Sequence, residues 1–432
     1  MPSHHYSRLH IDIHGLFQSP MSWAHVNREM ALALDQLGCH VAVIAHRGFC
    51  YDPCFHLDPR FEALRKRPQH QEIDVSFEYP LHYMRLSARF KVGLLVYETT
   101  ELPPAWVEAI ERYLDLLVVP SQFCRQVATT SGVSPERIQV IPYGFNPVIF
   151  NPGAWVSLQP DANTDCRWGD LHPQPPCTPG SVAPSPYKVA LSHIPAGGVG
   201  PPRFTEVLHA CPKKRPHKDG FVFLCVAMPH IRKGITDLLE AFSEEFHAEE
   251  QVSLVLKVPY VPRGNEKMKG WEIPGLEERI DSCQGGGLSG PGISLIPTVL
   301  CPDEMPALYA SCDAYVQPSY SEGFGLSILE AKAMGRPTVV TGWGGHMDFC
   351  TSFNSFLVEY DMIPAGKAQY DHCSPTARCA QPRKASLREQ MRMVYTNQVE
   401  KDKKVVQSLR DIKGLTWAKA ARRLGDLLLE RI

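Results

Sequence analysis

The sequence predicts an α/β protein built from two doubly wound parallel sheets, one in each of two domains that face a cleft. The first observation is length, because 432 residues exceed one ordinary core and suit two domains of roughly 150 to 200 residues. The second is that short apolar runs alternate with amphipathic helical periods in two series, and strands that alternate with helices form parallel sheets. The third is a stretch rich in Pro and Gly that separates the two series.

The first series, residues 1–150, opens with a β-α-β pattern in which strands at Leu9–Ile13 and His40–Ala45 flank a helix at Ala24–Leu37. Later, a proline opens one expected helix and a serine caps another, as is typical of helix starts. These later elements alternate between strand and helix and occupy Val92–Tyr97, Pro103–Leu114, Leu116–Pro120, Ser121–Ser131 and Ile138–Pro142. The segment from Phe49 to Tyr83 carries no recognisable motif.

Residues 151–218 differ in composition from the flanking sequence. They are rich in Pro, Gly and Ser, with runs such as Pro173–Pro176 and Gly197–Pro202. Such a composition is typical of a linker or an inserted segment. It favours a tolerated surface excursion over a Pro-rich docking ligand, and we assign it no activity.

The second series, residues 219–385, repeats the alternation of strands and helices. Strands are expected at Phe221–Ala227, Val252–Val258, Ile293–Pro297, Ala314–Gln317 and Thr338–Thr341. Helices are expected at Ile235–Phe246, Leu276–Cys283, Asp303–Ala310 and Leu326–Met334. In residues 386–432, two amphipathic helices at Ser386–Val399 and Thr416–Leu429 should complete the chain. The last of them should pack back on the body through its apolar face, which consists of Trp417, Leu424, Leu427 and Leu428.

Composition excludes several classes of protein. A formal net charge of −2 gives no whole-chain reason to expect nucleic acid as a partner. The N-terminus lacks the apolar core of a signal peptide and no long uncharged apolar run occurs, so we expect a cytoplasmic location. The 14 cysteines are scattered and should be free thiols. The histidines near the N-terminus, His4, His5, His10 and His14, lack a second cluster that would complete a metal site, and we predict none.

One stretch, Ser321–Glu330, carries the strongest chemical signal. It follows an expected strand and opens an expected helix, a layout in which backbone N–H groups and the helix dipole face an anion. Gly323 and Gly325 allow close backbone approach, so we expect a diphosphate to be bound by Gly323, Phe324, Gly325 and Leu326. No Lys and Thr follow the glycines, which argues against a Walker loop.

Two glutamates strengthen this signal. Glu322 lies in the loop before the helix, and Glu330 lies more than one turn inside it. Glu322 can accept a hydrogen bond from a sugar hydroxyl beside the phosphates, and Glu330 can reach a ribose on the same side. The alternative is a solvated loop carboxylate and an ordinary surface helix residue.

These residues resemble a known family. The segment Ser321–Ala331, together with Met334–Pro337 and Gly344–Gly345, resembles the E-x7-E signature of the retaining glycosyltransferase family 4 (glycosyl transferases group 1). Similarity extends to Pro120–Phe123, Ile141–Pro152 and Arg232–Gly234, and so covers most of residues 8–152 and 219–360. The resemblance implies the GT-B fold, with two Rossmann-like domains, the nucleotide-sugar donor held mainly by the second and the acceptor entering from the first.

The resemblance also implies the reaction. A sugar would pass from a nucleoside-diphosphate sugar to a hydroxyl acceptor with retention, and the acceptor would be a carbohydrate, a lipid-linked compound or another small molecule. No cofactor is implied, and no Asp-x-Asp motif occurs, so we expect no metal requirement. Peripheral membrane contact stays open, because relatives work on lipid-linked acceptors.

Cations at the start of a helix are the next implied site residues. Lys233 and Arg232 would neutralise the donor diphosphate and stabilise the charge that grows on the departing nucleotide. The alternative is a charged pair at a helix start, where cations are ordinarily disfavoured. Lys257 lies at the end of one expected strand and Val299 follows another. Both lie at carboxyl ends and could frame the nucleotide base, although a plain loop role is equally open.

The sequence departs from the family pattern at three places. Of the usual glycine-rich loop in the first domain, Gly15 alone matches clearly, and it remains a candidate for donor contact. Glu98 stands where many relatives have a histidine near the donor sugar, and could bind a hydroxyl, act as a base or sit in the loop. Met228 stands where many relatives have an arginine, and Arg232 could substitute for it, since a guanidinium can contact two phosphate oxygens.

These departures keep other interpretations open. A binding or scaffold protein could keep the fold and have lost sugar transfer. A sugar-phosphate phosphorylase or nucleotide-sugar epimerase could share the two-domain layout, but the context of the two glutamates matches the transferases better.

Overall fold

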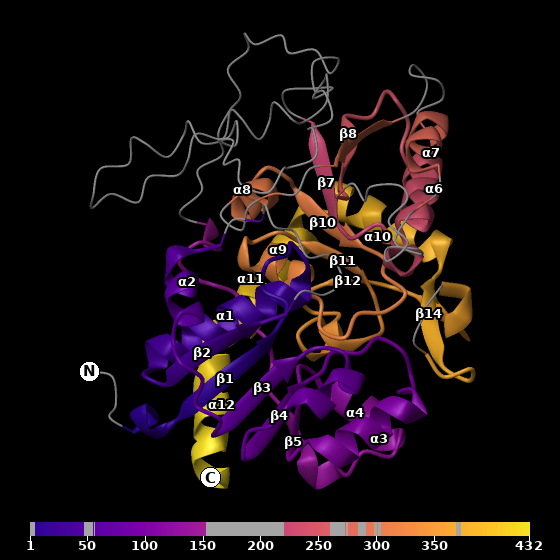
Figure 1. The fold of residues 1–432 in the computed structure, drawn as a ribbon. Coiled ribbons are helices and arrows are strands. Elements are labelled where there is room, and N and C mark those ends of the chain that lie inside the picture. The colour runs from indigo at the N-terminus through magenta and orange to yellow at the C-terminus, as the bar shows by residue number, and fades with distance from the viewer. Residues whose placement is uncertain are drawn as a thin grey trace, which may run out of the picture.

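The computed structural model describes residues 5–46, 55, 57–152, 220–259, 273, 275–283, 291–297, 300, 304–368 and 373–432. Two six-stranded parallel sheets form the cores of two domains, and the second domain lies above the first in Figure 1. Helices flank both sheets, as expected for two doubly wound α/β domains.

The N-terminal sheet has the strand order β2-β1-β3-β4-β5-β6, all parallel. Its strands are β1 (His10–Gly15), β2 (His40–Ala45), β3 (Ile73–Phe77), β4 (Phe90–Leu94), β5 (Leu116–Val119) and β6 (Ile138–Val140). Its helices are α1 (Ser22–Leu37), α2 (Pro59–Arg65), α3 (Pro104–Tyr113) and α4 (Gln122–Thr130), with 3-10 turns η1 (Tyr6–Arg8), η2 (Pro80–Arg85) and η3 (Pro135–Arg137). The expected elements are present with shifted ends, and Ser121 caps α4 by accepting a hydrogen bond from Cys124 N at 3.1 Å.

Strand β3 lies inside the sheet, although the sequence pattern did not reveal it. A buried carboxylate, Asp74, interrupts its apolar run. The carboxylate contacts His14 Nε2 at 2.9 Å and accepts hydrogen bonds from the backbone N–H groups of Ser87 and Ala88 at 2.8 and 2.9 Å. Because these partners satisfy the buried charge, a polar residue is tolerated where strand patterns call for an apolar one.

The C-terminal sheet has the order β12-β11-β10-β7-β8-β9 and is also parallel. Its strands are β7 (Phe221–Val226), β8 (Val252–Lys257), β9 (Gly292–Ile296), β10 (Ala314–Gln317), β11 (Thr338–Thr341) and β12 (Phe356–Val358). Its helices are α6 (Ile235–Glu245), α7 (Leu276–Cys283), α8 (Met305–Ala310) and α9 (Leu326–Ala333), with 3-10 turns η7 (Ile231–Lys233), η10 (Gly345–Asp348) and η11 (Ala365–Ala368). Every strand and helix expected in the second series is present.

A two-stranded antiparallel hairpin, β13 (Tyr360–Pro364) and β14 (Arg378–Pro382), follows the second sheet. It reaches the first domain, because Thr100 N donates to Arg378 O at 3.1 Å and Arg378 N donates to Thr100 Oγ1 at 2.9 Å. Thr376 Oγ1 also donates to the Glu101 carboxylate at 2.6 Å. The hairpin thus joins the two domains beside the loop after β4.

Three helices end the chain, where the sequence led us to expect two. The helix expected at Ser386–Val399 corresponds to α10 (Lys384–Thr396). The helix α11 (Gln398–Ile412) was not expected; it begins where Asn397 caps it by accepting from Glu400 N at 3.0 Å. The last helix, α12 (Trp417–Arg431), crosses to the first domain and packs along α1 (Figure 1). The side chains that bury its apolar face are Trp417, Leu424 and Leu428, with Leu427 partly buried, as predicted.

The described cysteines carry free thiols, most of them buried. None of the helices in the described ranges combines the length and the apolar character needed to cross a lipid bilayer.

Candidate active site

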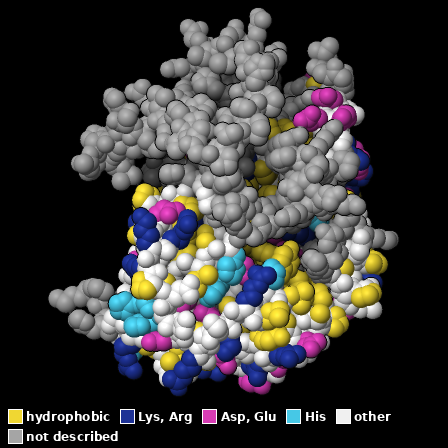
Figure 2. All heavy atoms as spheres, viewed as in Figure 1, with side chains coloured by type: hydrophobic (Ala, Val, Ile, Leu, Met, Phe, Trp, Pro, Cys, Tyr) yellow, Lys and Arg dark blue, Asp and Glu magenta, His cyan; other side chains and the backbone are white. Residues whose placement is uncertain are grey.

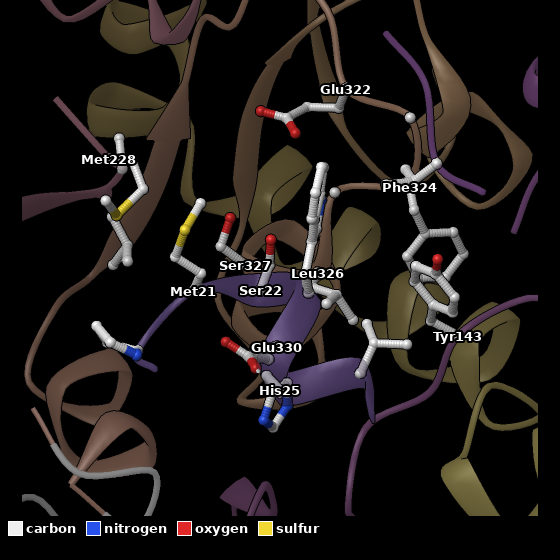
Figure 3. Close-up of a pocket in the computed structure, with 18 of the residues that line it drawn as sticks. Met21, Ser22, His25, Tyr143, Met228, Glu322, Phe324, Leu326, Ser327 and Glu330 are labelled. Carbon is white, nitrogen blue, oxygen red and sulfur yellow. Dashed lines mark ion pairs between the residues drawn. The ribbon is translucent and has the colours of Figure 1, made fainter. Parts of the chain in front are cut away.

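A cavity of about 340 Å³ lies between the two domains and is lined by residues of both. Figure 3 shows Glu322 at one end of this cavity and Glu330 with His25 at the other. Met228 lies on one side of the space between them and Tyr143 on the opposite side. The carboxyl ends of both parallel sheets contribute loops to this cavity, which is where open α/β sheets bind ligands.

Glu322, in the loop between β10 and α9, is held by a dense set of hydrogen bonds. Its Oε1 atom accepts from Lys233 Nζ at 2.5 Å, from Gln317 Nε2 at 2.6 Å and from Ser319 Oγ at 2.7 Å. Because Gln317 ends β10 and Ser319 follows it, the strand itself fixes the carboxylate. The residue is therefore a positioned carboxylate, and the alternative of a solvated loop residue is wrong.

Arg232 and Lys233 reach this carboxylate from η7, directly before α6. Arg232 Nη1 lies 3.7 Å from Glu322 Oε2 and donates to Ser321 O at 3.2 Å, while Arg232 Nη2 lies 3.5 Å from Glu98 Oε1. The structure thus gathers four residues, Arg232, Lys233, Glu322 and Glu98, in one mostly buried cluster. Glu98 belongs to the N-terminal domain, so the cluster spans the cavity between the domains.

Burial and charge act against each other in this cluster. Burial favours the protonated form of Glu322, but the Lys233 and Arg232 charges outweigh it and hold the pKa of this carboxyl well below its usual range. Burial and the Arg232 charge lower the pKa of Lys233, and Glu322 opposes that shift. Burial raises the pKa of the Glu98 carboxyl, which Arg232 opposes. Glu322 is therefore an anion that needs a cation beside it.

Glu330 lies one helix turn further along, on α9. Its Oε2 atom accepts from Tyr309 Oη at 2.9 Å, and its Oε1 atom lies 3.9 Å from His25 Nε2 on α1. Burial raises the pKa of Glu330 to about 7, although the Tyr309 hydrogen bond works against the rise. Burial and the Arg28 charge lower the pKa of His25 to about 3, so this imidazole is neutral.

The glycines of the loop are explained by contacts with the first domain and by backbone conformation. A Cβ atom added to Gly323 would lie 2.3 Å from Val96 Cγ2 and 2.7 Å from the Tyr97 carbonyl oxygen. Gly325 has a φ of 87° and is the N-cap of α9. Ser121 Oγ donates to Gly323 O at 2.7 Å, so the start of α4 also holds the loop. The close approach at Gly323 is therefore to the opposite domain.

The remaining predicted donor residues fall into two groups. Phe324, Leu326 and Lys257 line the cavity, and burial lowers the pKa of Lys257 to about 8. Gly15 is not among the residues that line the cavity, because it packs on α1 instead: an added Cβ would lie 2.4 Å from Asn27 Nδ2. Val299 lies outside the described residues.

Sequence reasoning missed several residues that line the cavity, notably Trp23, Tyr79, Trp106 and Tyr143. Each lies near the end of a strand or the start of a helix, so strand ends followed by aromatic residues were the available signal. His25 was missed as well. One helix turn separates it from the start of α1, which could have placed it beside the cavity.

The N-terminal histidines do not form a metal cluster in the described part of the chain. Across the described ranges, no group of three or more His, Cys, Asp or Glu side chains has an arrangement that could hold a metal ion. The His10 ring contacts the His40 ring edge-to-face and the His70 ring at a tilt, with centroids 4.8 and 5.0 Å apart. Figure 2 shows histidine side chains gathered over this domain, with acidic and basic side chains interspersed around them.

In comparison with known proteins, the second domain gives the clearest match. Residues 220–369 match the family model Glycosyl transferases group 1. A probable sucrose-phosphate synthase from Oryza sativa subsp. japonica is 28% identical over 198 residues, 44% of this chain and 18% of that protein. A D-inositol 3-phosphate glycosyltransferase from Pseudarthrobacter chlorophenolicus is 36% identical over 103 residues, 23% of this chain and 24% of that protein. The similarity spans less than a quarter of the length of either relative.

Solved structures resemble the whole chain at low identity. Sucrose-phosphate synthase from Thermosynechococcus elongatus has a TM-score of 0.62 at 14% identity, covering 98% of each chain. HepE from Anabaena, solved in complex with UDP-glucose, has a TM-score of 0.60 at 14% identity, covering 97% of this chain and 99% of that one. At this identity the likeness shows the fold. The chain has the two Rossmann-like domains of the GT-B fold, and residues 220–369, in its second domain, are similar to the glycosyl transferases of group 1.

Proposed function

We propose that this protein transfers a sugar from a nucleoside-diphosphate sugar to a hydroxyl acceptor, with retention of the anomeric configuration. The observation that carries the proposal is the cluster in which Lys233 and Arg232 meet Glu322 just before α9, with Glu330 further along the same helix. A helix start with two adjacent cations suits a diphosphate, and two carboxylates on either side suit hydroxyl groups.

We propose one orientation for the donor in this arrangement. The diphosphate would lie between Lys233, Arg232 and the first turn of α9, where Leu326 and Ser327 begin the helix. Glu330 would accept hydrogen bonds from the ribose, and Glu322 from a hydroxyl of the donor sugar. Lys257 would lie beside the nucleotide, where an anionic ligand offsets its buried charge.

We propose that Lys233 moves from Glu322 towards the phosphate when the donor binds. In the free protein its ammonium contacts Glu322 Oε1 at 2.5 Å, and an ammonium can also donate to a phosphate oxygen, since it has three N–H groups. Binding would leave Glu322 with Gln317 and Ser319 and open its remaining acceptor positions to the sugar. The same residues would therefore hold both the leaving group and the group that is transferred.

In the transfer step, the bond between the anomeric carbon and the diphosphate oxygen breaks, and a bond from the acceptor oxygen to that carbon forms on the same face. The electron pair of the broken bond stays on the diphosphate, whose oxygen takes the acceptor proton. Lys233 and Arg232 stabilise the negative charge that develops there, more strongly in the transition state than in the ground state. The scheme requires no protein nucleophile.

We also propose that the reaction needs neither a metal ion nor a cofactor. The support is that Arg232 and Lys233 supply two positive charges where the diphosphate would lie, and that the sequence has no Asp-x-Asp motif. UDP-glucose is the first donor to test, because HepE was solved with it. The cytoplasmic location and the possible membrane contact stay predictions.

The test is release of nucleoside diphosphate over a panel of UDP-, GDP- and ADP-sugars with mixed hydroxyl acceptors. Proton NMR of the product gives the anomeric configuration, and the same assay with a chelator tests the metal requirement. We expect release with at least one donor, a product with the donor's configuration and no loss of rate with chelator. A protein that neither binds nor turns over any donor would refute the proposal.

A second candidate is a GT-B protein that binds sugar nucleotides and does not transfer. Two observations favour it: Met228 lines the cavity where many relatives have an arginine, and Glu98 contacts Arg232. This protein would show nucleotide-induced thermal stabilisation, with no release above the rate of spontaneous hydrolysis for any acceptor.

A further inference from the structure

The N-terminal side of the cavity presents an aromatic wall, made of Trp23, Phe77, Tyr79, Tyr97, Trp106 and Tyr143. Each ring contacts the next one along the wall. Ring centroids are 4.8 Å apart for Trp23 and Tyr79, 5.7 Å for Tyr79 and Trp106, and 5.4 Å for Trp106 and Tyr97. On the other side of Trp23, Phe77 lies 5.6 Å away, and Tyr143 lies 6.1 Å beyond it.

The aromatic wall is built by several parts of the N-terminal domain. Trp23 lies in the first turn of α1, Phe77 ends β3, and Trp106 lies in the first turn of α3. Trp23 and Tyr79 are partly exposed, so their rings are open to a ligand in the cavity. The wall ends at Tyr143, whose ring lies 5.1 Å from Phe324 in the predicted diphosphate loop (Figure 3).

Tyr143 carries a buried hydroxyl that has no hydrogen-bond partner among the described residues. An unpaired buried hydroxyl costs free energy, and nearly all such groups in proteins are paired. Because this oxygen is shielded from the cavity, the ring of Tyr143, and not its hydroxyl, is the part that a ligand in the cavity can contact.

Charge is the second feature of this side of the cavity. Among the described lining residues of the N-terminal domain, Arg28 is the one permanent cation, and it is already occupied. Its guanidinium donates to Phe17 O and to Ser19 O and lies 4.6 Å from the centre of the Phe55 ring. His25 is neutral, because burial lowers its pKa to about 3.

The anions of the same side are Glu29 and Glu98. Arg232 and Lys233 lie across the cavity, contact Glu322 and Glu98, and in the proposed function meet the donor diphosphate. A phosphate on the acceptor would therefore face two carboxylates, with no further cation from the described part of the wall. Like charges at an interface disfavour binding.

We infer that the acceptor is an uncharged compound with a sugar or polyol ring, which stacks on the aromatic wall at Trp23 and Tyr79. The inference rests on the proposed function and specifies its acceptor. The C–H groups of a sugar ring face make favourable contacts with aromatic faces, while its hydroxyls pair with polar groups at the rim. Both relatives named above carry phosphate in their names, and their similarity to this chain covers limited segments.

Matched acceptor pairs test this inference. Glucose with glucose 6-phosphate, fructose with fructose 6-phosphate, and myo-inositol with inositol 3-phosphate differ within each pair by the phosphate alone. With the donor identified by thermal shift, we expect kcat/KM to be about tenfold or more higher for the neutral member of the pair that reacts. Equal or higher kcat/KM for the phosphorylated member would overturn the inference.

Two variants locate the acceptor on the wall. Trp23→Leu and Tyr79→Leu each remove a partly exposed ring of the wall. We expect each to raise the acceptor KM about tenfold and to leave the donor KM unchanged. Tyr113→Leu, on the same domain but outside the cavity lining, is the control. Unchanged acceptor KM in both variants, with melting temperatures near that of the unmodified protein, would contradict the assignment.

The two levels of proposal fail differently. If no donor binds, the proposed function is wrong. If a donor binds but no neutral acceptor changes the rate of nucleotide release or the tryptophan fluorescence of the donor complex, the inference about the acceptor is wrong while the donor site stands.

Discussion

The two sides of the cavity use different chemistry. The C-terminal side consists of paired charges, with Lys233, Arg232 and Glu322 joined by short contacts and Glu330 beyond them. The N-terminal side is an aromatic wall with few charges. Paired charges depend on a few residues at fixed places and leave a short, readable motif, whereas an aromatic wall can be assembled from side chains scattered over several elements.

Similarity to known proteins also differs between the two sides of the cavity. The family model matches residues 220–369, which contain the charged side. Over the N-terminal side, similarity to solved structures is that of the fold, at 14% identity. The difference indicates that the charged C-terminal side of such a protein can be inferred from relatives, whereas its aromatic N-terminal side must be read from its own structure.

The largest expected effect tests the charged side. Lys233→Ala should lower kcat/KM for transfer by about 10²–10³-fold, the typical cost of removing one group that stabilises transition-state charge. Lys384→Ala is the matched control, because Lys384 is an exposed cation of the same domain that pairs with Glu244. Steady-state nucleotide release measures both variants. Equal activity of Lys233→Ala and the control would remove Lys233 from the site.

The next effect tests how closely the two sides approach. Gly323→Ala should destabilise the protein by about 1–3 kcal/mol, because the added methyl would overlap Val96 and the Tyr97 carbonyl. Gly366→Ala is the control, since nothing lies within 4 Å of its added Cβ. Denaturant unfolding measures both. A stable Gly323→Ala protein would mean that the domains are further apart in solution than in this structure.

A smaller effect tests the charge that the N-terminal side contributes. Glu98→Gln should reduce transfer by about tenfold, since hydrogen bonds to charged groups contribute roughly 1.5–3 kcal/mol, and should leave nucleotide binding unchanged. Glu108→Gln, exposed on α3, is the control. Kinetics and nucleotide titration together separate the two readouts. Weakened nucleotide binding with unaltered transfer would place Glu98 on the donor side of the comparison.

The last effect concerns Glu330 and pH. Burial raises its pKa to about 7 in the folded protein from an ordinary 4.5, so between these values the folded protein keeps a proton that the unfolded chain has released. Stability should therefore fall as pH rises through this window. The melting temperature of the unmodified protein should drop between about pH 5 and about pH 7.5, and Glu330→Gln should make this drop smaller. The difference should be roughly 2–4 °C for each kcal/mol of pH-dependent stability that Glu330 contributes. An unchanged drop would show that Glu330 titrates normally.

Much of the fold was predictable from the sequence, because most strands are uninterrupted apolar runs. β3 was not, since the Asp74 carboxylate inside it is stabilised by hydrogen bonds from partners outside the strand, His14 and the Ser87–Ala88 backbone. The β13–β14 hairpin was not predicted either. It is stabilised partly by hydrogen bonds to Thr100 and Glu101 of the other domain, which no local pattern can indicate.

The candidate site was predictable in the same uneven way. The structure brings Lys233, Arg232, Glu322 and Glu98 together as the motifs suggested. Gly323 and Gly15 were both expected to contact the donor, but in the structure Gly323 packs against Tyr97 and Gly15 against Asn27. The sequence shows that a glycine is present but does not show which neighbouring atom requires it. The donor roles of these residues, and of Lys257 beside the nucleotide, stay predictions until ligand binding is measured.

The path of α12 has a practical consequence for building hybrid enzymes. This helix belongs to the end of the chain but packs on α1 of the first domain. Two hydrogen bonds join the same regions: Tyr6 Oη donates to Asp426 at 2.5 Å, and Phe145 N donates to Leu415 O at 3.1 Å. An exchange of N-terminal domains between two such proteins must therefore move residues 5–152 together with residues from about 413 onward. A chimera with a single junction within residues 153–219 would take its N-terminal domain from one protein and α12 from the other, so that α12 would pack on an α1 helix it does not match.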